Sequence, residues 1–285
     1  MKIVKLMGGL GNQMFQYMFG QYLSKKYNEK IYYDVEFFKH YSESEKLEIR
    51  NIELLKFNFD IEIVDYKKYP FLNYNNRKEK FIYLLKGLLS LNRNTFNFVS
   101  DSKFTLISKV FSIFFRNNYY IGYWQAYRYI LDLEFKLKDS QNLINTKVKE
   151  KILNSNAVSI GVRRGDYVKL GAIICDIEYY KKAINLIDKK LDNPVFYIFS
   201  DDIEWCRKNI KSSDKYFFVE ANKDTPFENM ELMSLCKHNI ISNSTYEWWG
   251  AFLNKNKQKI VIYPKKWKFY ETKKNKLIPS EWIKI

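Results

Sequence analysis

The sequence is poor in the residues that bind metals or form disulfides. Its 285 residues include two histidines and three cysteines, and no C-x-x-C pair occurs. No two aspartates stand two positions apart, so the D-x-D triplet with which many transferases hold a metal is missing. We expect the cysteines to be reduced core thiols in a cytoplasmic protein. We also expect chemistry that needs neither a metal nor another cofactor.

Long apolar runs are lacking as well. No window reaches the roughly 18 apolar residues of a membrane span, and the apolar run near Met1 is too short for a signal peptide. Lys109 interrupts the nearest approach to a span, Phe104–Phe115, which we expect to be a buried helix. The chain is therefore predicted to be cytoplasmic, with peripheral contact at the inner face of a membrane left open.

Positive charge is in excess. Lysine and arginine number 48 against 32 acidic residues, which gives a formal charge of +16, and aromatic residues make up 18% of the chain. This balance favours an anionic partner, namely nucleic acid, an anionic membrane surface or a phosphorylated substrate, although coding bias would also produce it. The aromatic residues follow the spacing of core positions and form no stacking module, so we do not expect a nucleic-acid-binding protein.

The most informative stretch is MGGLGNQMFQ, Met7–Gln16, between a strand predicted at Ile3–Leu6 and a helix with an apolar stripe. A glycine-rich turn between a strand and a helix presents backbone N–H groups to an anion. Asn12 is predicted to be the N-cap of the helix. A tight turn with no ligand is the alternative interpretation of the same residues.

Strands and helices alternate with short connections over the second half, which predicts an α/β fold with a doubly wound parallel sheet. We place a domain boundary near residue 150, giving domains 1–150 and 151–285. Strands are predicted at 3–6, 30–35, 119–125, 157–162, 195–199, 216–219, 239–241 and 259–263. Helices are predicted at 13–27, 51–57, 81–91, 104–115, 127–143, 176–191, 202–210, 225–237 and 246–253, with Asp176 and Thr225 as caps.

Polar residues follow three of these strands, at the edge where open parallel sheets bind ligands. Arg163 and Arg164 should point to opposite sides, one toward a diphosphate and the other toward a neighbour such as Asp166. Asp202 is predicted to cap a helix, which leaves Asp201 for a ribose or a guanine. The turn Ser242–Thr245 offers hydroxyl and N–H groups to an anion, with a simple helix cap as the alternative.

Five segments together resemble the α-1,2-fucosyltransferases of glycosyltransferase family 11. They run in order along the chain: GGLGNQMFQ from Gly8, GYWQ from Gly122, RRGDY from Arg163, FSDD from Phe199 and SNSTYEWWGA from Ser242. The resemblance implies two Rossmann-like domains facing across a cleft, the glycosyltransferase B type. It also implies GDP-fucose as donor, no metal, and inversion at the anomeric carbon.

The resemblance also implies site residues. Arg163 resembles the arginine that holds the donor β-phosphate, and Asp201 resembles the acid that recognises guanosine. One position departs from the family, because Gly161 stands where a histidine is usual. The donor-binding set is Arg163, Asp201, Ser242, Asn243, Ser244 and Thr245, and the sugar and acceptor set is Gly9, Gly11, Asn12, Gln13, Trp124 and Gln125.

The expected reaction is a single displacement in which an acceptor hydroxyl attacks opposite the leaving GDP. Arg163 and the Ser242–Thr245 turn would stabilise the charge that grows on the diphosphate. Asp166, Asp34 and Glu247 are the candidates for a general base, and Asp166 is preferred. We expect a galactose-terminated glycan as acceptor. Transfer of another nucleotide sugar on the same scaffold, or a carbohydrate-binding relative without activity, are the alternatives.

Overall fold

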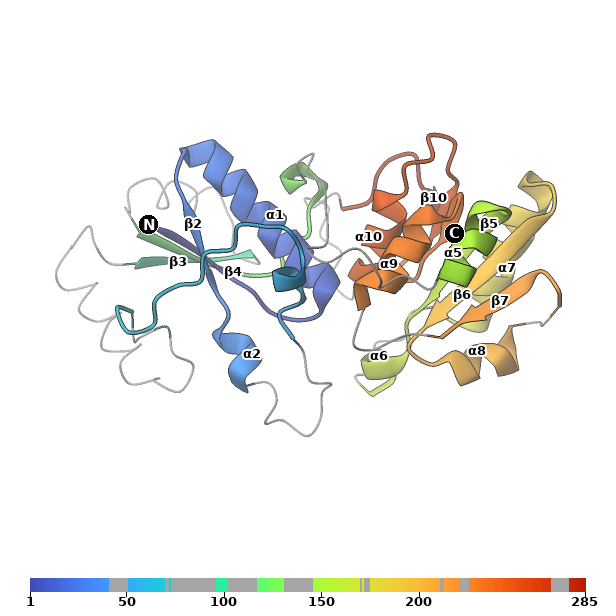
Figure 1. Ribbon diagram of the computed structural model, residues 1–285, viewed down its shortest axis with the longest axis horizontal. Helices are drawn as coiled ribbons and strands as arrows, with labels where there is room; N and C mark the ends of the chain where they lie inside the picture. Colours follow the sequence, from blue (N-terminus) through green and yellow to red (C-terminus); the bar gives the residue numbers. More distant parts are fainter. Residues whose placement is uncertain are drawn as a thin grey trace. The chain divides into compact units, whose positions relative to one another are not determined.

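The computed structural model describes residues 1–40, 51–69, 72, 96–101, 117–130, 146–169, 171, 175–210, 213–220, 226–267 and 277–285. The chain divides into two compact units, Met1–Asp139 and Ser140–Ile285 (Figure 1). The boundary predicted at residue 150 falls inside α5 (Thr146–Leu153), which packs against β5 and α9 of the second unit. Among the described helices, none is long and apolar enough to cross a membrane.

The first unit contains a parallel sheet with the strand order β2-β1-β4-β3. The strands are β1 (Lys2–Lys5), β2 (Ile31–Asp34), β3 (Phe96–Ser100) and β4 (Asn117–Ile121). Because β1 pairs with β2 on one side and β4 on the other, the strand order reverses between β1 and β4. In open parallel sheets this reversal is where ligands bind, so the loops after β1 and β4 are the candidate positions.

Helix α1 (Leu10–Tyr27) follows the glycine-rich loop and packs on this sheet. The prediction that Asn12 is its N-cap is wrong. Gly9 occupies that position with extended backbone, and Asn12 lies in the first turn of the helix. The helix ends at Asn28, which adopts the left-handed conformation typical of a C-terminal cap. A short helix, α2 (Glu36–His40), follows β2.

Two ranges predicted as helices contain 3₁₀ turns. Within 51–57, the turn is Glu53–Lys56. At the start of 127–143, the turn is Tyr127–Tyr129, and Ile130 after it is extended. Residues 131–143 and the helices predicted at 81–91 and 104–115 lie outside the described residues. Strand β3 has no counterpart among the predictions.

The second unit contains a six-stranded parallel sheet with the order β10-β9-β8-β5-β6-β7. Its strands are β5 (Asn156–Val162), β6 (Pro194–Ser200), β7 (Tyr216–Val219), β8 (His238–Ile240), β9 (Val261–Tyr263) and β10 (Ile283–Lys284). This is the order of a Rossmann sheet, and it reverses between β5 and β8. The doubly wound sheet predicted from the sequence is therefore confirmed, with β10 as an unpredicted edge strand.

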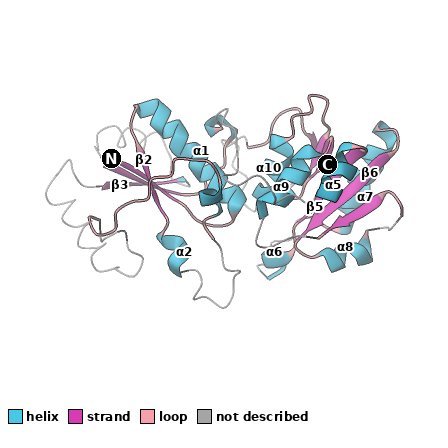
Figure 2. Cartoon of the chain, in the orientation of Figure 1, coloured by secondary structure: helices cyan, strands magenta, loops and turns pink. Residues whose placement is uncertain are grey.

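Helices cover both faces of this sheet (Figures 1 and 2). They are α6 (Gly165–Lys169), α7 (Ile177–Lys190), α8 (Ile203–Asn209), α9 (Pro226–Leu235) and α10 (Thr245–Leu253), in addition to α5. Asp176 and Asp202 cap α7 and α8 as predicted, by accepting from the backbone N–H groups of Tyr179 and Trp205. Helix α9 begins at Pro226, and Thr225 lies outside the described residues.

Alternate residues of β5 face opposite layers of helices, as the two-residue period of a strand requires. Val158 and Ile160 pack in the core formed with α7 and α8. Ala157 packs in the core formed with α5 and α9. A Cβ at Gly161 would meet Glu247 of α10, so position 161 faces the layer of α9 and α10. The two arginines follow directly after the end of β5.

Candidate functional site

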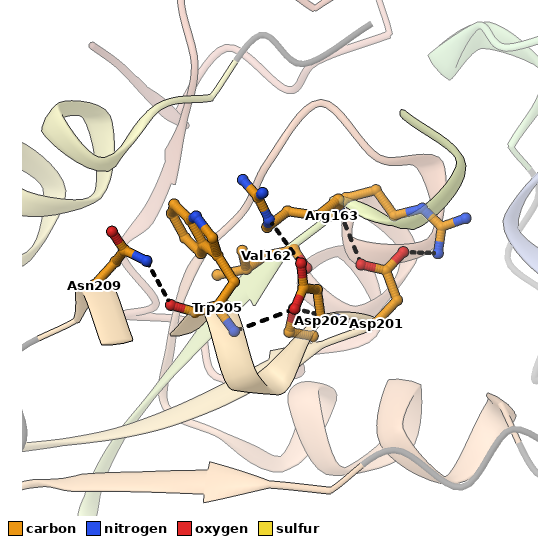
Figure 3. Close-up of polar contacts among 8 residues, drawn as sticks. Val162, Arg163, Asp201, Asp202, Trp205 and Asn209 are labelled. Atoms are coloured by element: carbon orange, nitrogen blue, oxygen red, sulfur yellow. Dashed lines mark hydrogen bonds and ion pairs between the residues drawn. The ribbon is translucent and has the colours of Figure 1, made fainter. Parts of the chain in front are cut away.

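The two arginines after β5 point to different partners. Arg163 forms an ion pair with Asp201, with 2.6 Å between Nη1 and Oδ2 (Figure 3). Its guanidinium lies over the ring of Tyr167. The backbone N–H of Arg164 donates to the other oxygen of Asp201 at 2.8 Å. Asp201 Oδ1 thus holds the end of β5, whereas Oδ2 contacts Arg163 and is buried without a hydrogen-bond partner among the described residues. That Asp201 binds a ribose or a guanine stays a prediction.

Arg164 is held against α8. Its Nε lies 3.0 Å from Asp202 Oδ2, and its guanidinium lies over the indole of Trp205 at 4.1 Å. Asn209 in turn donates to the backbone carbonyl of Trp205 (Figure 3). The predicted partner of Arg164 was Asp166, whose side chain lies outside the described residues. Arg164 thus has a packing role, whereas Arg163 stays half-buried at the carboxyl edge of the sheet.

Two tyrosine hydroxyls donate hydrogen bonds to backbone carbonyl groups of the turn after β8. Tyr179 donates its hydroxyl to the carbonyl of Ile241 at 2.6 Å, and Tyr167 donates to the carbonyl of Asn243 at 3.4 Å. Ser244 is the N-cap residue of α10, but its hydroxyl makes no capping hydrogen bond. The alternative interpretation, in which the turn only caps the helix through a serine side chain, is therefore not supported at Ser244. Its position at the strand-order reversal and at a helix N-terminus suits an anion.

Glu247 lies directly behind this turn. Its carboxylate accepts from the backbone N–H of Ser242, and the side chain is 3% exposed. Burial raises the pKa of this carboxyl to about 7, while the Ser242 N–H and the nearby Arg163 oppose the rise. Burial therefore favours the protonated form of Glu247. A buried position makes it a poor base for an acceptor in solvent.

In the first unit, the loops after β1 and β4 are joined by side-chain amides. Gln125 donates to Asn12 Oδ1 at 2.8 Å, and Gln16 donates to the carbonyl of Gly122 at 3.0 Å while accepting from the N–H of Met7. Gln13 is buried and donates to the carbonyl of Gly8 at 3.0 Å. The sequence analysis did not predict that Gln16 links these two loops. A polar glutamine one helical turn after Gln13, within an otherwise apolar stripe, is the pattern that could have indicated it.

Trp124 lies in the core of the first unit. The residue is 0% exposed, and its ring stacks on Phe19 with 3.9 Å between centroids. The acceptor contact predicted for Trp124 stays a prediction. Its φ of +53° is an uncommon conformation for a large residue, and Asp101 accepts from its backbone N–H at 3.0 Å. Gln125 Oε1, one residue on, is buried without a hydrogen-bond partner. Strain of this kind concentrates at functional sites.

The remaining candidates for a general base are constrained by their surroundings. Asp34 is 0% exposed and accepts from Tyr66 at 2.6 Å, from Tyr119 and from the N–H of Glu36. It is thus a structural carboxylate at the end of β2. Asp166 is the second residue of α6, two positions after Arg164, and remains a candidate for the general base. Among the described residues, no group of three acidic, histidine or cysteine side chains could hold a metal ion.

The two Rossmann-like units, each with polar loops at its strand-order reversal, have the build of a glycosyltransferase of the B type. A solved structure of the α-1,6-fucosyltransferase NodZ soaked with GDP-fucose shares this fold, with a TM-score of 0.52 and 14% identity. The match covers 87% of this chain and 90% of that one. The predicted fold class is therefore confirmed.

The chain belongs to glycosyltransferase family 11, since the sequence model of the family Glycosyl transferase family 11 matches residues 1–285. It is 35% identical to an α-1,2-colitosyltransferase of Escherichia coli, over 99% of this chain and 98% of that protein. It is 31% identical to the O-antigen biosynthesis glycosyltransferase WbnK of Escherichia coli, over 98% and 99%. A shorter stretch, 35% of the chain, is 34% identical to 29% of the galactoside 2-α-L-fucosyltransferase Sec1 of Mus musculus. The protein is a glycosyltransferase.

Proposed function

We propose that this glycosyltransferase transfers fucose from GDP-fucose to the 2-hydroxyl group of a terminal galactoside, with inversion and without a metal. The observation that carries the proposal is the pair of anion-binding features at the β5–β8 reversal. One is Arg163, held in place by Asp201, and the other is the uncapped N-terminus of α10 at Ser244. The fucosyltransferase relative and the NodZ structure soaked with GDP-fucose support this donor.

The proposed role of Arg163 is to stabilise the leaving diphosphate. Its guanidinium has five N–H donors, and Nη1 lies 2.6 Å from Asp201 Oδ2. The side chain is 21% exposed, so a ligand at the carboxyl edge of the sheet can reach it. Donors fixed before the reaction stabilise developing charge without reorganising. Arg163 and the N–H groups at the start of α10 would thus take the part of a metal ion.

The first unit is proposed to recognise the sugar and the acceptor. Asn12 and Gln125 lie at its β1–β4 reversal and hold one another, which leaves Gln125 Oε1 as an acceptor of hydrogen bonds. Gly9, Gly11 and Gln13 belong to the same loop and helix start. Sugar hydroxyls suit such amides, because an amide both donates and accepts. Asp166 is proposed as the general base that takes the proton of the acceptor hydroxyl.

A second donor is favoured by one specific observation, the similarity to a colitosyltransferase over nearly the whole chain. Colitose is fucose without its 3-hydroxyl group. A site that hydrogen-bonds a hydroxyl rejects the analogue that lacks it by roughly 10⁴-fold, whereas an apolar site discriminates weakly. The preference between the two donors therefore reports whether this protein contacts the 3-hydroxyl.

The test is a donor panel with the purified protein. GDP-fucose, GDP-colitose, GDP-mannose and UDP-galactose are compared on a β-galactoside acceptor, and the linkage of the product is determined by NMR. The proposal expects the highest kcat/KM with GDP-fucose and an α-1,2 product. A higher kcat/KM with GDP-colitose supports the second donor instead. Binding of GDP without transfer to any galactoside would identify a carbohydrate-binding relative without activity.

A further inference from the structure

The start of α10 carries the sequence of a capping box that the structure does not form. Ser244 and Glu247 have the S-x-x-E spacing in which the glutamate normally bonds the N–H of the capping serine. Here the Glu247 carboxylate instead accepts from the N–H of Ser242, two residues further back. The Ser244 hydroxyl makes no capping bond. Glu247 therefore supports the turn that leads into the helix rather than the helix itself.

Space for this carboxylate exists because residue 161 has no side chain. A Cβ added to Gly161 would lie 2.4 Å from both Cδ and Oε2 of Glu247, which is closer than such atoms approach in proteins. A side chain at position 161 and the carboxyl group of Glu247 thus exclude each other. The glycine that departs from the family's usual histidine is matched by a glutamate that fills the vacated volume.

The turn is otherwise fixed through its carbonyl groups. Tyr179 bonds the carbonyl of Ile241 and Tyr167 bonds that of Asn243, so Glu247 supplies the contact to an N–H. The titratable and charged groups that act on the Glu247 carboxyl come from several elements. They are Arg163, Asp201, Cys175, Tyr179, Tyr180 and Tyr246. Arg163 is the cation of this set, and the Asp201 carboxylate opposes the charged form of Glu247.

We propose that Glu247 is a positioning residue of the anion-binding turn, occupying the space that Gly161 leaves and linking the binding of a nucleoside diphosphate to the uptake of a proton. The inference rests on the proposed function, because it needs a diphosphate at the Ser242–Thr245 turn. An anion bound there disfavours the ionised form of Glu247, as like charges do. Since burial already places the pKa of this carboxyl at about 7, the bound anion raises it further and a proton enters near neutral pH.

The first experiment measures GDP binding to the whole protein by titration calorimetry from pH 6 to 8.5. Glu247→Gln is the matched variant, because its amide oxygen can still accept from Ser242 but cannot ionise. The ratio of the two affinities cancels the titration of GDP itself. We expect the wild-type protein to lose affinity relative to Glu247→Gln by up to about tenfold per pH unit above pH 7. A ratio that stays constant with pH overturns the inference.

The second experiment is a double-mutant cycle for the shared volume. Gly161→Ala should weaken GDP binding by about tenfold or more in the Glu247 protein and by less than about twofold in the Glu247→Ala protein. Equal losses in both backgrounds would show that the two side-chain positions do not compete, which overturns the inference. Thermal melting identifies variants that are unfolded. If the wild-type protein does not bind GDP at any pH, the proposed function fails, and this outcome is distinct from both others.

Discussion

At the scale of single residues, the two arginines after β5 should differ in what they contribute. Arg163→Ala and Arg163→Lys are expected to lower kcat/KM by about two orders of magnitude or more, because losing one fixed charge donor typically costs roughly 3 to 4 kcal/mol. Arg164→Ala should leave kcat nearly unchanged and lower stability by about 1 kcal/mol, since it removes the contacts with Asp202 and Trp205. Steady-state kinetics and thermal melting check both. An inactive but stable Arg164→Ala protein, beside an active Arg163→Ala protein, would reverse the assignment.

Asn12 supplies a second test at this scale. Asn12→Ser should melt like the parent and bind GDP within about twofold, because the nucleotide is assigned to the other unit. Transfer should fall by about tenfold, since the shorter side chain loses the hydrogen bond from Gln125. Asn12→Asp is the matched control, because its carboxylate still accepts from Gln125. Transfer by Asn12→Ser at the parental rate would show that this amide pair has no part in the reaction.

The sequence predicts residues well where the interaction is local. Asp176 and Asp202 are caps because each side chain reaches an N–H three residues on, and the structure confirms both. Asn12 fails as a cap because the backbone of Gly9 is already extended there, which starts the helix earlier. Trp124 could not be placed either. Its burial depends on Phe19, more than a hundred positions away, and no local pattern reports such a contact.

At the scale of elements, the junction between β8 and β9 predicts a dependence on pH. Nδ1 of the buried His238 accepts from the N–H of Ile260 at 3.0 Å, which requires that nitrogen to carry no proton. Burial, together with the charge of Lys237, lowers the pKa of His238 below its ordinary value of 6.5. The unfolded chain therefore binds more protons than the folded one just below pH 6.5, so stability is lost as the pH falls through this range.

Melting temperatures at pH 7.5 and 5.5 check this expectation. The loss on acidification should be smaller for His238→Asn, whose amide oxygen can accept the same N–H and does not titrate. Equal losses for the two proteins would show that His238 does not contribute to the acid sensitivity of the fold.

Elements were predictable in proportion to the length and regularity of their apolar patterns. In the second unit, β5, β6 and β7 were placed within a residue or two, because buried parallel strands have continuous apolar runs between turn residues. Strand β10 has two residues, and its pairing with β9 is what defines it. Strand β3 is only five residues long, FNFVS, with Asn97 interrupting its apolar residues, and its pairing with β4 defines it. Such strands form because they pair with strands elsewhere in the chain, so a local sequence pattern does not predict them.

At the scale of the whole molecule, the reaction is predicted to proceed without a divalent cation. Turnover of GDP-fucose in excess EDTA should stay within roughly twofold of the rate with magnesium, because Arg163 and the start of α10 are proposed to provide the positive charge at the leaving group. The measurement is the initial rate of transfer in each condition, with the protein dialysed against chelator beforehand. Complete loss of turnover on chelation, restored by magnesium, would contradict the prediction.

The resting ion pair between Arg163 and Asp201 sets a threshold for any ligand of this arginine. An incoming anion must offer the guanidinium more than the carboxylate already does, which a singly charged ion such as chloride or bicarbonate does poorly. A diphosphate carries two charges and several oxygens, so it can share the arginine with Asp201 rather than displace it. Under the proposed function, Asp201 would thus compete with weak anions for this arginine and hold its side chain in place. Selectivity of this kind would follow from a carboxylate that the sequence alone assigns to the ligand.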